Sequence, residues 1–163
     1  MSRIGRHIFS PYWYPLMRSF FHTFTVKANI DKVWEFYVDI RHLQAISPPK
    51  MHLEIVKSTH QKLVQGSEVW LTGILVTRSN WHSIITSLAP YEYVDEMITG
   101  RFKVWKHIHT FDKIDNEHTE VIDKIEFEMH YGIIGRLLEG IVLSILQRIF
   151  DYRQQATREK VES

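Results

Sequence analysis

Apolar doublets near the end of the chain predict a long amphipathic helix. They are Ile133-Ile134, Leu137-Leu138, Ile141-Val142, Ile145-Leu146 and Ile149-Phe150. Because an α-helix turns once in about 3.6 residues, a repeat of about four residues drifts by ~40° per step, and the apolar stripe winds about half-way round the axis. A stripe this broad is typical of a helix gripped by a strongly curved sheet. After Asp151 the sequence turns polar, and we expect that tail to fray.

The stretch from residue 51 to about 130 has the pattern of β-strands. The predicted strands lie near residues 52–57, 67–78, 80–88, 91–98, 101–111 and 119–130. The spacers between them are short and contain residues that favour turns, namely Gly66, Ser79-Asn80, Pro90 and Gly100. Since short spacers join neighbouring strands in an antiparallel sense, the pattern predicts a meander.

The chain before this meander predicts one more strand and two short helices. Residues 20–27 mix aromatic and β-branched side chains, as strands do. Asn29 is a favourable N-cap for a helix that reaches Tyr37, and a second short helix over 40–46 ends before Pro48. The whole pattern predicts an α+β fold, with a curved antiparallel sheet of about seven strands wrapped round the C-terminal helix. A space between such a sheet and helix is the usual place for a ligand.

One strand of the meander carries two histidines among large aromatic residues. Alternation of side chains along a strand places Trp105, His107, His109 and Phe111 on one face. In the next strand Asp123 takes a position on the apolar face, where an unpaired carboxylate is costly. We expect Asp123 to pair with one of the two histidines, or to share bound water with them, inside a cavity. Three roles stay open: a structural pair, a polar contact to a ligand, and general acid–base catalysis.

The same residues suggest a metal site only weakly. Two histidines and a carboxylate form one known class of metal site. The sequence offers none of the further ligands and glycines that accompany strand-borne metal motifs, so we expect no metal and no cofactor. It also lacks the phosphate-binding loop, the dinucleotide-binding glycines, the nucleophile elbow and the zinc-protease motif.

Composition narrows the class of protein further. The chain contains no Cys, which excludes disulfides and thiolate chemistry. A formal net charge of only +1 argues against a dedicated nucleic-acid binder. No apolar run approaches the ~20 residues that a membrane helix needs, and no secretory signal pattern is present. We therefore expect a cytoplasmic protein.

The first residues differ from the rest in charge. No acid occurs before Asp31, whereas aromatic residues are interspersed with basic ones. The basic residues are Arg3, Arg6, Arg18 and Lys27. Residues 1–18 are either a segment that makes peripheral contact with an anionic membrane or a partner, or an irregular lead-in whose aromatic side chains pack on the body. Pro11 and Pro15 interrupt a continuous helix and favour the lead-in, with a single domain following at 19–158.

Several of these segments together resemble the SRPBCC superfamily of helix-grip proteins, which includes START-related, polyketide cyclase/dehydrase and lipid-transport proteins. They are Phe24-Thr25-Val26, Asp31-Lys32-Val33-Trp34-Glu35-Phe36, Pro48-Pro49, Gly66, Trp81, Tyr93-Val94-Asp95-Glu96, Gly100, Phe102, the run from Trp105 to Phe111, Thr119 and Asp123. The match covers residues 19 to 153 and looks like a subgroup with a Trp-x-His-x-His-x-Phe strand. Arg101 departs from the proline expected after that glycine.

The resemblance implies a cavity between the sheet and the long helix that binds an apolar or aromatic molecule. We expect the protein to bind a hydrophobic small molecule or lipid, and not nucleic acid. The expected cavity residues are Trp34, Trp70, Trp81, Tyr93 and Trp105, with His107, His109 and Asp123 at the polar end. One alternative is a cyclase or dehydratase in which His107 or His109, oriented by Asp123, exchanges a proton with the substrate. Another is a stress- or membrane-associated accessory protein that docks through residues 1–18.

Overall fold

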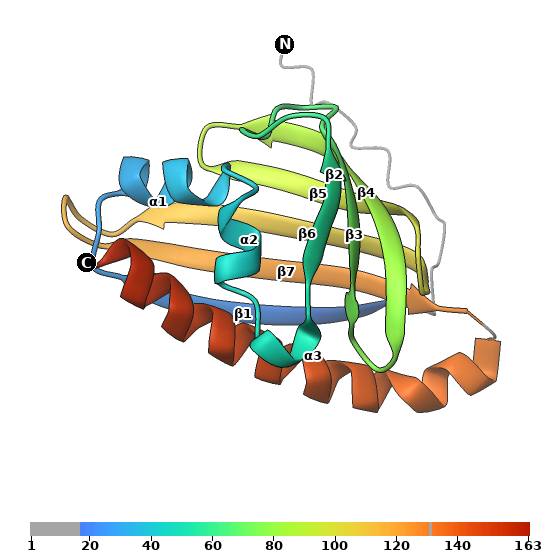
Figure 1. The fold of residues 1–163 in the computed structure, drawn as a ribbon. Helices are drawn as coiled ribbons and strands as arrows, with labels where there is room; N and C mark the ends of the chain where they lie inside the picture. The colour runs from blue at the N-terminus through green and yellow to red at the C-terminus, as the bar shows by residue number, and fades with distance from the viewer. Residues whose placement is uncertain (1–16, 131) are drawn as a thin grey trace, which may run out of the picture.

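The computed structural model describes residues 17–130 and 132–163, in which one antiparallel sheet curves around a long helix (Figure 1). The strands are β1 (Arg18–Val26), β2 (Glu54–Ser58), β3 (Glu68–Ile74), β4 (Arg78–Ala89), β5 (Glu92–Thr99), β6 (Phe102–Lys113) and β7 (Thr119–Met129). Their order across the sheet is β1-β7-β6-β5-β4-β3-β2, so consecutive strands from β2 to β7 are neighbours. The predicted α+β fold, with an antiparallel sheet of about seven strands that includes a meander of six, is confirmed.

The helices cover the concave side of the sheet. They are α1 (Ile30–Tyr37), α2 (His42–Ala45), the 3-10 turn η1 (Pro49–Met51) and α3 (Gly132–Val161). The long helix α3 packs on β1 and β7, and α1 packs on β6 (Figure 1). The Asn29 side chain accepts a hydrogen bond from the Lys32 backbone N–H, which confirms the predicted N-cap of α1.

Strand limits differ from the prediction at one turn. The pattern predicted a strand over 67–78, but β3 ends at Ile74 and residues 75–77 form the turn into β4. Leu75 and Val76 continue the apolar pattern of the strand, and that continuity concealed the turn. The expected turn at Gly66 is present, and its φ of +86° lies in the left-handed region that glycine adopts without strain.

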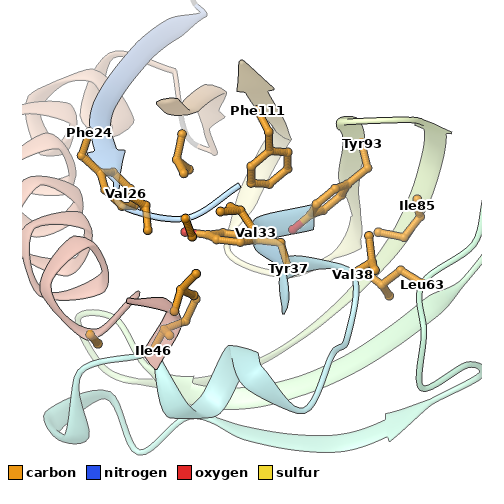
Figure 2. Packing of buried hydrophobic residues seen from close by; sticks show 14 of the residues in the cluster. Phe24, Val26, Val33, Tyr37, Val38, Ile46, Leu63, Ile85, Tyr93 and Phe111 are labelled. Atoms are coloured by element: carbon orange, nitrogen blue, oxygen red, sulfur yellow. The ribbon is translucent and has the colours of Figure 1, made fainter. Parts of the chain in front are cut away.

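A cluster of buried residues joins α1, α2 and the C-terminal part of α3 to the sheet (Figure 2). Figure 2 shows Tyr37 and Val33 of α1 reaching toward Phe111 of β6 and Tyr93 of β5. The rings of Tyr37 and Phe111 lie 4.8 Å apart between centroids, edge to face. Burial of side chains of this size stabilises a fold by about 1.5–3 kcal/mol each.

The apolar stripe of α3 faces the sheet over only part of its length. The side chain of Leu146 is 2% exposed and that of Val142 is 3% exposed, but Leu138 is 44% exposed and Ile134 is 67% exposed. At about 100° per residue, these three positions are turned away from Leu146 by about 40°, 80° and 120°. The drift therefore turns Ile134, Leu137 and Leu138 toward solvent, and the prediction that the sheet grips the full stripe is wrong there.

The end of α3 is well packed, so the expectation that the chain frays after Asp151 is wrong. The helix continues to Val161, whose side chain is buried. Thr157 is buried too and shares a hydrogen bond of 3.2 Å with the Tyr37 hydroxyl. Arg158 donates a hydrogen bond of 3.0 Å to the Thr25 carbonyl. These contacts fasten a polar-looking segment to α1 and β1.

Candidate functional site

Three neighbouring strands bring four titratable side chains together on the concave face. The antiparallel register pairs His109 of β6 with Asp123 of β7, and it pairs His107 with Asp95 of β5. Side chains alternate along each strand, so residues two apart on β6 point to the same side. We call Asp95, His107, His109 and Asp123 the polar quartet.

The two histidines of the quartet lie between its two carboxylates. His107 Nε2 donates to Asp123 Oδ1 over 2.9 Å, and His109 Nδ1 lies 2.9 Å from the same oxygen with poorer alignment. On the other side, His109 Nε2 donates a hydrogen bond of 3.3 Å to Asp95 Oδ2, which also lies 3.5 Å from His107 Nδ1. The two imidazole rings are in contact, with centroids 3.6 Å apart. The predicted pairing of Asp123 with a histidine is confirmed by the hydrogen bond from His107, and His109 lies in contact with the same carboxylate.

The quartet shifts the pKa values of its members in different directions. Burial lowers the pKa of His107, and the neighbouring His109 lowers it further. Burial also disfavours the charge on His109, but its contacts with Asp123 and Asp95 outweigh this effect and raise its pKa. Burial would raise the pKa of Asp123, yet the two imidazoles hold it well below its ordinary value. The arrangement therefore keeps Asp123 ionised and makes His109 the more basic imidazole.

A cavity of about 170 Å³ lies beside the quartet, between the sheet and α3. Its wall is mostly apolar and includes Trp81, Met97, Phe102, Trp105, Leu146 and Phe150. Asp95, His107 and His109 reach this wall, whereas Asp123 lies behind the imidazoles and is fully buried. The cavity thus has an apolar body and one polar corner.

The structure sorts the residues that the sequence assigned to the cavity. Of the residues assigned in this way, those that line the cavity are Trp81, Tyr93, Trp105, His107 and His109. Trp70 is not among the lining residues: it alternates with the buried Leu71 on β3, and its ring stacks on His82 with centroids 4.2 Å apart. Trp34 packs edge to face on Phe111, with centroids 5.8 Å apart, and belongs to the core.

Two lining residues, Asp95 and Arg153, were missed as site residues by the sequence interpretation. Asp95 lies two residues after Tyr93, so strand alternation alone could have placed it on the cavity face. Arg153 lies four residues after Ile149 on the inward face of α3, but the expected fraying hid this spacing. Its guanidinium lies 5.0 Å from the centroid of the Phe150 ring, and its buried Nε has no hydrogen-bond partner within residues 17–130 and 132–163.

Comparison by sequence finds no relative, and comparison by structure finds many. No known family model matches the chain. No curated protein matches it either. A START superfamily protein from Mycobacterium smegmatis superposes with a TM-score of 0.68 at 13% identity, over 90% of this chain and 97% of the other.

Two solved enzymes share the same architecture. The Zhui aromatase/cyclase from a Streptomyces species has a TM-score of 0.67 at 21% identity, over 90% of this chain and 94% of the enzyme. Norcoclaurine synthase from Thalictrum flavum, solved with dopamine and hydroxybenzaldehyde, has a TM-score of 0.64 at 15% identity, over 88% of each chain. Identities this low establish the fold alone. The chain has the helix-grip fold of the START-related SRPBCC proteins.

Proposed function

We propose that the protein binds a small hydrophobic or aromatic molecule in the cavity between the sheet and α3. The observation that carries this proposal is an apolar cavity of about 170 Å³ with polar groups gathered at one corner. Cavities of roughly 150 Å³ in other proteins hold a single aromatic ring such as benzene. This size favours a ligand of about one aromatic ring over a long-chain lipid.

The polar corner supports a ligand with an acidic or phenolic group. Arg153 and the imidazoles of His107 and His109 all reach the cavity. A buried guanidinium is costly without a partner, and Arg153 forms no ion pair within the described part of the chain. A ligand oxygen that accepts a hydrogen bond from Arg153 would supply that partner. The aromatic ligands of norcoclaurine synthase fit the same proposal, because that enzyme shares this fold.

Ligand binding is tested with small aromatic probes. Benzoate, phenol and 4-hydroxybenzaldehyde are titrated against the purified protein, with intrinsic fluorescence and thermal shift as readouts. Ser83→Leu narrows the cavity from its wall and is expected to weaken binding at least tenfold. Trp70→Phe, on the outer side of β3, is the matched control and should bind as the parent does. The proposal fails if none of the probes binds and native mass spectrometry shows no co-purifying small molecule.

A second candidate function is acid–base catalysis of the cyclase or dehydratase kind. It rests on His107, whose lowered pKa keeps the imidazole neutral while Asp123 orients it at the cavity wall. A neutral imidazole held in this way is suited to take a proton from carbon next to a carbonyl. NMR would then detect deuterium exchange of the methyl protons of acetophenone, and His107→Asn would abolish it. Exchange no faster than in buffer would exclude this candidate.

Membrane docking through residues 1–18 stays a prediction, because residues 1–16 lie outside the described part of the chain. Within that part, no helix has both the length and the hydrophobicity that crossing a membrane requires. Co-sedimentation with anionic vesicles, with and without residues 1–16, tests docking directly. Equal sedimentation of the two forms would rule out this segment as the anchor.

A further inference from the structure

Three side chains of the polar quartet present metal-ligand atoms to one another at the cavity wall. One ligand atom each from Asp95, His107 and His109 lies within 4.8 Å of the other two. Asp95 Oδ2 lies 3.3 Å from His109 Nε2 and 3.5 Å from His107 Nδ1. Ligand atoms that share one ion at about 2.0–2.2 Å lie roughly 3.0–3.6 Å apart, so the two distances from Asp95 Oδ2 already suit a shared ion.

Asp123 fixes which nitrogen of His107 is available as a ligand atom. Its carboxylate accepts the His107 Nε2–H, and it also faces His109 Nδ1 at 2.9 Å. A neutral imidazole carries a single N–H, so a proton on Nε2 of His107 leaves a lone pair on its Nδ1, which faces Asp95. His109 Nε2 donates a hydrogen bond of 3.3 Å to Asp95 Oδ2, and its buried Nδ1 has no hydrogen-bond partner in the described residues. A bound metal ion would replace that Nε2–H proton and leave the single N–H of His109 on Nδ1, next to Asp123.

Two carboxylates flank the paired imidazoles, Asp123 from behind and Asp95 from the cavity side. A cation bound beside Asp95 would lie close to both rings, whose centroids are 3.6 Å apart. Arg153 forms no ion pair with either carboxylate in the described residues.

We propose that Asp95, His107 and His109 bind a divalent transition-metal ion such as Zn²⁺ or Fe²⁺, with Asp123 orienting both imidazoles from behind. Two imidazoles and one carboxylate suit these ions, and a carboxylate behind a histidine ligand is a common support for such sites. All three proposed ligand residues line the cavity. This inference revises the expectation of no metal, and it does not depend on the proposed organic ligand.

The test measures metal binding alone, without any organic ligand. Protein without a polyhistidine tag is stripped with a chelator, and Zn²⁺ is titrated by calorimetry and Co²⁺ by visible absorption. One equivalent is expected to bind. Asp95→Asn removes a ligand and Asp123→Asn removes the support, and each should weaken binding at least tenfold. Glu68→Gln is the control, because Glu68 pairs with His82 on the outer part of the sheet and should leave binding unchanged.

NMR on the unsubstituted protein keeps the test independent of variants that fail to fold. Long-range ¹H–¹⁵N spectra report the nitrogens of each imidazole with and without Zn²⁺. The proposal expects large shifts at His107 Nδ1 and His109 Nε2. It is overturned if one equivalent of Zn²⁺ does not bind, or if other histidines shift instead. It is also overturned if folded Asp95→Asn protein binds Zn²⁺ as tightly as the parent.

Discussion

Replacement of Asp123 by asparagine tests whether the polar quartet stabilises the fold or is present without stabilising it. The substitution keeps the shape of the side chain and removes its charge. It weakens the 2.9 Å hydrogen bond from His107 Nε2 and the 2.9 Å contact with His109 Nδ1. A hydrogen bond to a buried charged group contributes about 1.5–3 kcal/mol. Because the amide oxygen still accepts from one imidazole, we expect a loss of about 2–4 kcal/mol in the free energy of unfolding.

The measurement is urea unfolding at pH 7 in the presence of a chelator, followed by tryptophan fluorescence and circular dichroism. Glu68→Gln is a matched control, since His82 Nε2 lies 2.7 Å from Glu68 Oε2 while the Glu68 side chain is 37% exposed. Solvent screens that pair, so its loss should cost less than about 1 kcal/mol. If Asp123→Asn destabilises the protein no more than Glu68→Gln does, the reasoning is refuted. The quartet would then be retained for binding or catalysis at no benefit to stability.

Three further predictions concern stability outside the quartet. Leu146→Ala should cost about 2–5 kcal/mol in urea unfolding, and Leu137→Ala on the exposed side of α3 less than about 0.5 kcal/mol; equal costs would contradict the exposure pattern of the helix. Val161→Asp should lower the thermal midpoint by several degrees, because it buries an unpaired charge in a turn that a frayed tail would leave exposed. Hydrogen bonds from Arg41 lower the pKa of Asp39 from 3.8 to about 2, so Asp39→Asn should cost about 1–2 kcal/mol at pH 7. That cost should shrink as the pH falls from 4 to 2, and a constant cost would refute the ion-pair origin.

The elements with a clear two-residue period were predicted well from the sequence. Alternation along β6 and β7 placed His107, His109 and Asp123 on one face, and the structure brings them into contact. The short loop between these strands restricts the registers in which they can pair antiparallel. The functional role of that contact could not be predicted from the sequence, because a purely structural His–Asp pair and a ligand-binding site would contain the same residues.

The helix α3 was predicted less well, for a geometric reason. A repeat of doublets records which residues are apolar, but not which of them the sheet reaches. Glu139 is buried on the inward face, whereas Leu137 beside it is exposed. Arg153 and Thr157 are also buried, within a segment whose composition suggested a frayed tail. Their burial depends on contacts with α1 and with the cavity, which are distant in the sequence.

Whether a carboxylate can share a metal ion with a histidine depends on which nitrogen of the imidazole ring it faces. The sequence offered Asp123 as the acidic ligand, since it shares a face with His107 and His109. In the structure Asp123 accepts a hydrogen bond from His107 Nε2 and lies 2.9 Å from His109 Nδ1. These nitrogens are on the side of the rings away from Asp95, so Asp123 can orient the two histidines but cannot share a metal ion with them at the cavity. Asp95, from the strand on the other side of β6, faces the near nitrogens. Register and side-chain rotation across three strands decide this difference, and neither can be deduced from spacing along one strand.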